Sequence, residues 1–233
     1  MNDIESGNIL YGKKWCACGD SFTSGDFTGM EEADYLIPDG IYAGKKRVYP
    51  YLIGARNQME VVNLAVGGMT MCCVDGTREN AFTYREYYKN IPADADYITL
   101  KFGINDMHQN SPLGTIDDMN ITTYYGAWNT VLSYITENHP FAKVGIIISN
   151  GMFGNFTYAD AAVRAAVRWG IPYIDEVHDP KVPLLHRVKR EGLTEEAYER
   201  RMKAFSVNEV NRHPNPAAHE FESTFIEAWL RTL

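Results

Sequence analysis

The stretch KWCACGDS, residues 14–21, joins a largely apolar run to a Gly-Asp-Ser turn. Four similar runs follow it along the chain: MEVVNLA (59–65), DYITLKF (96–102), KVGIIIS (143–149) and IPYID (171–175). Continuous rather than alternating apolar residues are typical of strands covered on both faces, as in a parallel sheet. The sequence therefore predicts a parallel sheet of about five strands, with Ser21 just beyond the carboxyl end of the first.

Helical patterns separate these runs. Apolar side chains recur every three or four residues in 119–138, and the pattern in 158–170 closes on Gly170, a residue type suited to a left-handed cap. The last helix is predicted to follow Asn215 as N-cap, with Pro216 in the first helical position, and a short helix is expected near 194–204. Strand and helix alternate without a linker, which predicts one three-layer α/β/α domain over residues 1–233.

Two segments are predicted to be insertions into that core: residues 26–56, rich in Tyr, Gly and Pro, and residues 177–210, rich in charge. Connections of this length serve as binding loops or lids about as often as they serve as packed additions. The aromatic residues of the first segment either cover a substrate or belong to the core, and both readings stay open. They are Phe27, Tyr35, Tyr42, Tyr49 and Tyr51.

Composition restricts the possible partners. The chain is 45% apolar and carries a net charge of −8, with 22 basic and 30 acidic residues, which argues against nucleic acid or an anionic membrane. It has no run of about eighteen apolar residues, and its N-terminus is acidic where a signal peptide is basic, so we expect a cytoplasmic protein without membrane insertion. The four cysteines lack zinc-site spacing and are expected to be free, buried thiols: Cys16, Cys18, Cys72 and Cys73.

Polar residues follow the first three strands, at the edge where parallel sheets bind ligands. Gly19-Asp20-Ser21 comes after the first strand, Gly67-Gly68 after the second and Gly103-Ile104-Asn105-Asp106 after the third. His213 precedes the last helix, in a turn that can fold over the same edge.

These residue types are the ones that acyl transfer from an ester needs. A serine hydroxyl becomes a nucleophile when a histidine takes its proton, and the oxyanion that forms needs preorganised donors. A backbone N–H at a glycine turn, the N–H of Ser21 and the amide of Asn105 would supply three donors. Gly68 permits close approach because it has no Cβ.

With these blocks the chain resembles the SGNH hydrolases, also called GDSL hydrolases. The family's GDS block matches residues 19–21, with Phe22 where Leu is usual, and its GxND block matches residues 103–106 in full. The glycine of its second block aligns best with Gly68, with Gly67 as the near alternative. The His-Pro-Asn of its last block matches residues 213–215. The resemblance implies a flavodoxin-like central sheet and assigns Ser21, Gly68, Asn105 and His213 to catalysis.

One position departs from the family pattern. The family has Asp three residues before the histidine, and this chain has Val210, which can neither accept a hydrogen bond from the imidazole nor stabilise the imidazolium. Asn211, Glu209 or a backbone carbonyl can take over the orientation of His213. We favour Asn211 or a carbonyl over Glu209.

The sequence thus predicts a serine esterase or acylhydrolase that forms an acyl-enzyme on Ser21 and needs neither metal nor organic cofactor. A catalytically weakened binding protein on the same scaffold, suggested by Val210, and an acyltransferase with the same residues are the alternatives. The resemblance allows many small-molecule esters, and the acidic surface favours short-chain or carbohydrate-linked acyl esters over bulk lipid. The oligomeric state stays open.

The remaining polar residues receive structural interpretations. Asp20 and Asp106 are expected to hold loops by accepting backbone N–H groups, and His219 to sit in the first turn of the last helix as a structural residue. His108 either lines the pocket or lies on the surface. The second Gly-Asp pair, Gly25-Asp26, matches no family block and is interpreted as an ordinary turn into the first insertion.

Overall fold

The computed structural model describes residues 7–148, 155–179, 181–182 and 192–233. Its centre is a five-stranded sheet in the order β2-β1-β3-β4-β5, and all four neighbouring strand pairs are parallel. The strands are β1 (Lys14–Gly19), β2 (Glu60–Asn63), β3 (Tyr97–Lys101), β4 (Lys143–Ile148) and β5 (Tyr173–Asp175). The predicted three-layer α/β/α fold with a flavodoxin-like parallel sheet is confirmed.

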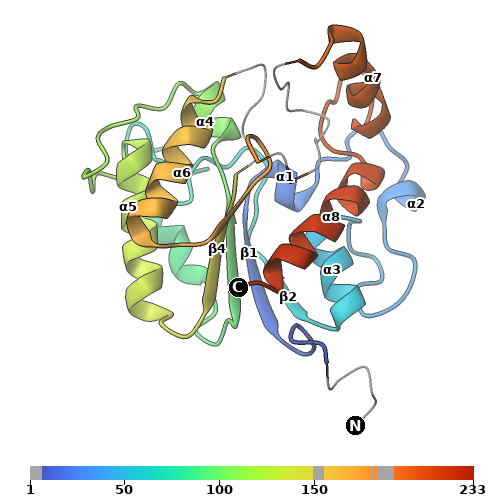
Figure 1. Cartoon of the computed structure of the whole chain (residues 1–233), viewed down its shortest axis with the longest axis horizontal. Coiled ribbons are helices and arrows are strands. Elements are labelled where there is room, and N and C mark those ends of the chain that lie inside the picture. The colour runs from blue at the N-terminus through green and yellow to red at the C-terminus, as the bar shows by residue number, and fades with distance from the viewer. Residues whose placement is uncertain (1–6, 149–154, 180, 183–191) are drawn as a thin grey trace.

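Helices cover both faces of this sheet (Figure 1). The long ones are α3 (Tyr49–Asn57) and α8 (Pro216–Leu230) on one face, and α5 (Tyr124–Asn138) and α6 (Thr157–Trp169) on the other. The remaining helices are α1 (Ser21–Ser24), α2 (Glu32–Tyr35), the 3-10 helix η1 (Tyr84–Asn90), α4 (Ile104–His108) and α7 (Glu195–Phe205).

The two apolar layers follow from the alternation of side chains along β1. Trp15 and Ala17 join a core with Ile226 and Leu230 of α8, whereas Cys16 and Cys18 point to the opposite core, which α5 and α6 cover. All four cysteines are buried, as predicted, and they are free. Burial raises the pKa of the Cys72 thiol to about 12, so it stays protonated at neutral pH.

Capping residues explain where the helices begin and end. Asn215 accepts from the Ala218 N–H at 3.0 Å with Pro216 next to it, and Gly170 closes α6 in the left-handed region at φ 64°, both as predicted. In α5 the expected start at residue 119 is wrong by several residues, because the Thr123 hydroxyl caps the helix by accepting from the Gly126 N–H at 3.2 Å.

A buried charge cluster joins the sheet to α8. The ammonium group of Lys101, at the end of β3, donates to Glu222 of α8 and lies 3.3 Å from Glu176, which follows β5. The side chains of all three residues are at most 4% exposed. Because a buried charge left without its partner is strongly destabilising, the cluster ties α8 to the carboxyl edge of the sheet.

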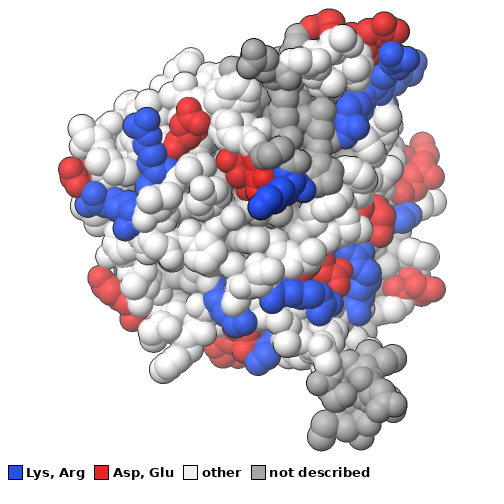
Figure 2. Space-filling model, in the orientation of Figure 1, with Lys and Arg blue, Asp and Glu red and all other residues white. Residues whose placement is uncertain are grey.

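The segment 26–56 contributes to the layers themselves. Its last part is α3, which contacts α8, and Tyr49 is fully buried with its ring centroid 6.1 Å from that of Trp15. Residues 180 and 183–191 of the second predicted insertion lie outside the described residues, and α7 follows them. On the face shown in Figure 2, basic and acidic side chains are interspersed. None of the helices in the described part of the chain is both long and apolar enough to span a membrane.

Candidate active site

Ser21 begins the short helix α1 directly after β1. The Asp20 carboxylate accepts from the Phe22 N–H at 2.9 Å and caps this helix, as predicted for Asp20. A Cβ at Gly19 would lie 2.4 Å from the Thr23 hydroxyl oxygen and 3.0 Å from the Lys101 carbonyl oxygen, so only glycine fits there. The strand therefore delivers Ser21 to the sheet edge, where the residue is buried, with 5% exposure.

His213 reaches Ser21 from the other end of the chain. Its Nε2 lies 2.9 Å from Ser21 Oγ across 192 residues of sequence, which is a hydrogen-bond distance between a nucleophile and a base. The Val207 N–H donates to the His213 carbonyl at 2.9 Å, and a β-bridge pairs Ser206 with Pro214. This turn holds His213 over the carboxyl edge of the sheet, as the sequence predicts.

Asn211 fixes the orientation of the imidazole. Its Oδ1 lies 2.7 Å from His213 Nδ1, while its Nδ2 faces three oxygens: the carbonyl of Thr28 at 3.0 Å and both the carboxylate and the carbonyl of Asp26 at 3.2 and 3.3 Å. Three acceptors around Nδ2 determine which way the amide points. The Oδ1 then accepts from Nδ1–H, which leaves the lone pair of Nε2 free to accept the Ser21 proton.

The residues that precede Asn211 in the turn point elsewhere. Asn208 Oδ1 accepts from the N–H groups of Val210 and Asn211 at 2.9 and 2.7 Å, and this turn leaves Val210 96% exposed. Glu209 lines a separate surface cavity. Of the three orienting groups considered from the sequence, Asn211 is the one that contacts the ring within the described part of the chain.

Asp26 is a site residue that sequence reasoning missed. The interpretation of Gly25-Asp26 as an ordinary turn is incomplete: Asp26 Oδ1 does accept from the Thr28 N–H at 3.0 Å, but Oδ2 also lies 3.7 Å from His213 Nδ1. Partial burial opposes ionisation of this carboxyl, yet the hydrogen bonds from Thr28 and the nearby His213 lower the pKa of Asp26 overall. A carboxylate therefore stands beside the histidine, from a part of the chain that no family block covers.

The loop after β2 runs alongside the end of β1. The N–H groups of Leu64 and Val66 donate to the carbonyls of Ala17 and Gly19 at 2.9 and 3.2 Å, which brings Gly67 and Gly68 beyond the same strand end as Ser21. Gly68 has φ 74°, a conformation that glycine adopts without strain.

The third block is tied to this loop by side chains. Asn105 Nδ2 donates to the Met69 carbonyl at 3.0 Å, and the Asp106 carboxylate accepts from the N–H groups of Met71 and Cys72 at 2.9 and 3.0 Å. Burial raises the pKa of Asp106 to about 6 although these two N–H groups lower it. Asp106 thus holds a loop, as predicted, and the oxyanion role of Gly68 and Asn105 stays a prediction.

The other two histidines named from the sequence lie outside this network. His219 is fully buried in the first turn of α8, with its ring centroid 5.8 Å from that of Phe27. His108 is exposed at the end of α4. Among the described residues, no group of three or more His, Cys, Asp or Glu side chains has the arrangement of a metal site.

A polar cavity of about 380 Å³ adjoins the site. It is lined by residues 24–30, which begin at the last residue of α1, together with Tyr35, Lys46 and Gly67, so it reaches from Asp26 to the loop that carries Gly68. Of the aromatic residues in segment 26–56, Phe27 and Tyr35 line this cavity, with ring centroids 4.9 Å apart. Tyr49 belongs to the core, and the Tyr42 hydroxyl bonds to the backbone of Met59 and Val61.

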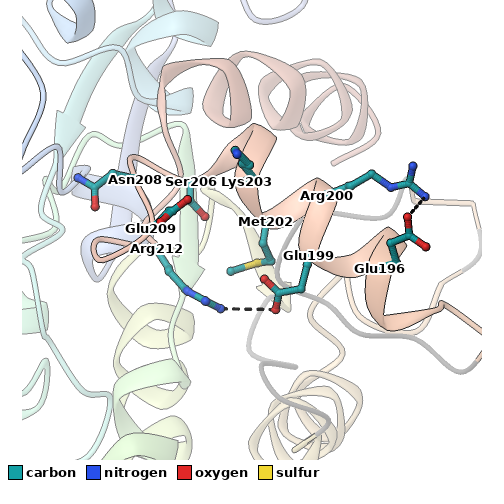
Figure 3. Close-up of a pocket in the computed structure, with 9 residues that line it drawn as sticks. All are labelled: Glu196, Glu199, Arg200, Met202, Lys203, Ser206, Asn208, Glu209 and Arg212. Atoms are coloured by element: carbon teal, nitrogen blue, oxygen red, sulfur yellow. Dashed lines mark ion pairs between the residues drawn. The ribbon is translucent and has the colours of Figure 1, made fainter.

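A second cavity, about 500 Å³, opens between α7 and the turn 206–212 (Figure 3). An ion pair between Arg212 of the turn and Glu199 of α7, 3.8 Å apart, crosses it, and Arg200 lies 3.4 Å from Glu196 on the same helix. Neither Ser21 nor His213 is among its described lining residues, although its wall is the turn that carries His213. Neither Ser21 nor His213 lines the smaller cavity either, but its lining includes Asp26, whose carboxylate lies 3.7 Å from His213 Nδ1.

A family model described as the GDSL-like Lipase/Acylhydrolase family matches residues 17–221. These residues include every block named above. None of the curated protein sequences matches the chain.

Solved structures match over nearly the whole chain. A protein from Lactobacillus plantarum is 23% identical with a TM-score of 0.68, over 96% of this chain and 98% of its own. A candidate GDSL-like lipase from Bacteroides ovatus is 18% identical with a TM-score of 0.63, over 95% and 99%. An active-site mutant of a family two carbohydrate esterase from Clostridium thermocellum is 13% identical with a TM-score of 0.55, over 94% and 63%. At these identities the likeness concerns the fold.

Proposed function

Because the chain belongs to the GDSL-like lipase/acylhydrolase family, we propose that it is a serine esterase that cleaves carboxylic esters through an acyl-enzyme on Ser21. One observation carries the proposal: Ser21 Oγ, His213 Nε2, His213 Nδ1 and Asn211 Oδ1 form a continuous hydrogen-bonded chain with separations of 2.9 and 2.7 Å. This is the geometry that general-base activation of a serine requires.

The reaction runs in two halves. Ser21 Oγ attacks the ester carbonyl carbon as its proton passes to His213 Nε2, and the carbonyl π electrons move onto oxygen. The C–O bond to the alcohol then breaks, and His213 returns the proton to the departing alkoxide. Water repeats the sequence on the acyl-serine, giving the carboxylic acid and free Ser21. Gly68, Asn105 and the Ser21 N–H are assigned to the oxyanion.

The cavity beside the site supports a polar substrate. Its lining brings together the hydroxyls of Ser24 and Thr28, the Asp26 carboxylate and the Lys46 ammonium group, with Phe27 and Tyr35 as aromatic surfaces. Such a mixture suits a hydroxylated alcohol or a short acyl chain better than a long alkyl chain. Short-chain or carbohydrate-linked acyl esters are therefore the proposed substrates, and the fold is shared with a carbohydrate esterase.

The proposal is tested by the hydrolysis of acetyl, butyryl and palmitoyl nitrophenyl esters and of acetylated sugars. Wild-type protein is expected to prefer short or sugar-linked esters, and Ser21→Ala to lose at least about a thousandfold in kcat. A variant that keeps the wild-type rate would overturn the mechanism, and a preference for palmitoyl would overturn the substrate class. Product analysis with added alcohols separates hydrolysis from acyl transfer, which uses the same residues.

A further inference from the structure

The position at which the family has the acid of its catalytic triad holds no carboxylate in this chain. A carboxylate from another loop nevertheless lies beside His213. Val210 is 96% exposed, whereas Asp26 Oδ2 lies 3.7 Å from His213 Nδ1 and Asp26 Oδ1 lies 3.2 Å from Asn211 Nδ2. On the basis of the proposed function, we infer that Asp26, in the loop after the nucleophile, supplies the negative charge for His213 through Asn211. The charge and the hydrogen-bond acceptor of a catalytic acid are thus divided between two residues.

The division of labour follows from the geometry. Asn211 Oδ1 is closest to Nδ1, at 2.7 Å, so it sets the ring orientation and the tautomer. A neutral amide adds little to the stability of the imidazolium that forms when Ser21 is deprotonated. A carboxylate 3.7 Å away does stabilise it, although water partly screens the pair because the side chains of His213 and Asp26 are 29% and 38% exposed.

Asp26 is held in place by groups that favour its ionised form. Its Oδ1 accepts from the Thr28 N–H at 3.0 Å as well as from Asn211, and Asn211 Nδ2 also binds the Asp26 and Thr28 carbonyls. A side chain at Gly29 would collide with Asn208 Nδ2 at 2.7 Å, which shows how closely the two loops pack. The loop 26–29 and the turn 208–213 therefore form one unit.

Other charged groups near this unit have different partners. Arg212, beside His213, lies 3.8 Å from Glu199 of α7, and Asp20 accepts from the Phe22 N–H. Lys46 donates to the Gly25 carbonyl at 2.7 Å, next to Asp26, and lines the same cavity. Glu209 faces the cavity at α7. Among the residues that the structure describes, Asp26 is the carboxylate that lies within ion-pair distance of the His213 ring.

The first test compares the pH dependence of kcat/KM in wild type and Asp26→Asn. Removal of the negative charge makes the imidazolium less stable, so the pKa of His213 falls. The acidic limb of the kcat/KM profile should therefore shift to lower pH by about one unit. The plateau should fall by about tenfold, because a weaker base takes the Ser21 proton less readily. Asp26→Ser, which keeps an acceptor for the Thr28 N–H, should shift the limb in the same direction.

The second test moves the charge. Asp26→Asn combined with Asn211→Asp places the carboxylate directly on Nδ1 with an amide behind it, so the acidic limb should return to its wild-type position. The plateau should recover only in part, because the new carboxylate oxygen replaces Asn211 Nδ2 beside the Thr28 and Asp26 carbonyl oxygens. Asp39→Asn removes a charge from an exposed position in the same segment and should change neither. Unfolding curves verify that each variant is folded, and Asp26→Ser decides the question if Asp26→Asn does not fold.

The pH dependence of fluorophosphonate labelling at Ser21 distinguishes a failure of the proposed function from a failure of the proposed role of Asp26. Wild-type protein that is not labelled contradicts the proposed function itself. Labelled wild type whose acidic limb is unchanged in both Asp26→Asn and Asp26→Ser contradicts the role of Asp26 alone. A plateau that falls without any shift of the limb, and without recovery in the double variant, would show that Asp26 only supports the loop.

Discussion

Val210 illustrates how a single residue can mislead when it is read by its place in a motif. A valine three residues before the histidine suggests a missing acid, and the exposure of its side chain, 96%, shows that the turn does not direct this position toward the ring at all. The Asn208 side chain, which accepts from the N–H groups of Val210 and Asn211, sets that direction.

This exposure leads to a prediction for Val210→Asp. A carboxylate at this solvated position is screened from His213, so kcat/KM and its acidic limb should stay within about twofold of wild type. The same substitution should not restore Asp26→Asn. A large gain in either background, measured by ester hydrolysis between pH 4 and 9, would mean that the turn reorganises to present residue 210 to His213.

Asp26 marks the limit of what the sequence can predict at this scale. The nucleophile, the base and the orienting asparagine lie within or beside recognisable blocks, and the structure brings Ser21, Asn211 and His213 together. Asp26 lies 185 residues from Asn211 along the chain, and its contact depends on how two loops pack. A turn signal such as Gly-Asp carries no information about such a partner.

At the scale of elements, α4 and the loop after β2 form one assembly held by Asp106. Two backbone N–H groups, from Met71 and Cys72, find their acceptors in this fully buried carboxylate. The next residue toward the N-terminus, Asn105, donates to the Met69 carbonyl. The position of both proposed oxyanion donors, Gly68 and Asn105, therefore depends on Asp106.

Asp106→Ala tests this dependence. Two buried N–H groups would lose their acceptors at a cost of about 1–3 kcal/mol each, so the free energy of unfolding should fall by at least about 2 kcal/mol. The kcat should fall more than KM rises, because the donors act on the transition state. Urea unfolding and ester hydrolysis measure the two effects, with Asp39→Ala as the exposed control. Unchanged stability and kcat would show that the loop holds its shape without Asp106.

The elements themselves were largely predictable, but only some of their ends were. The apolar run 59–65 predicts a longer strand than β2 (Glu60–Asn63). The N–H groups of Leu64 and Val66 still donate to β1 beyond Asn63, although the regular strand has ended there. Apolar periodicity placed α5 but not its start, which the Thr123 cap decides. Local hydrogen bonds that compete with regular structure leave little trace in an apolar pattern.

At the scale of the whole molecule, the parallel topology explains why distant residues meet. The strands β1, β2 and β3 are adjacent and run in the same direction, so the segments that follow them all emerge at one edge. The helix α8 brings the last block back to this edge, and the buried cluster of Lys101, Glu176 and Glu222 anchors it there. This assembly could be anticipated from strand order, whereas the contacts between the loops could not.

Ser21 should consequently be reactive only when the protein is folded. Incubation with a fluorophosphonate, followed by proteolysis and mass spectrometry, measures it directly. We expect a single adduct on Ser21 in native protein, much slower labelling in His213→Ala, and no adduct when the protein is unfolded in urea. Folded wild-type protein that carries no adduct, or one on a different serine, would contradict the assignment of Ser21 as the nucleophile.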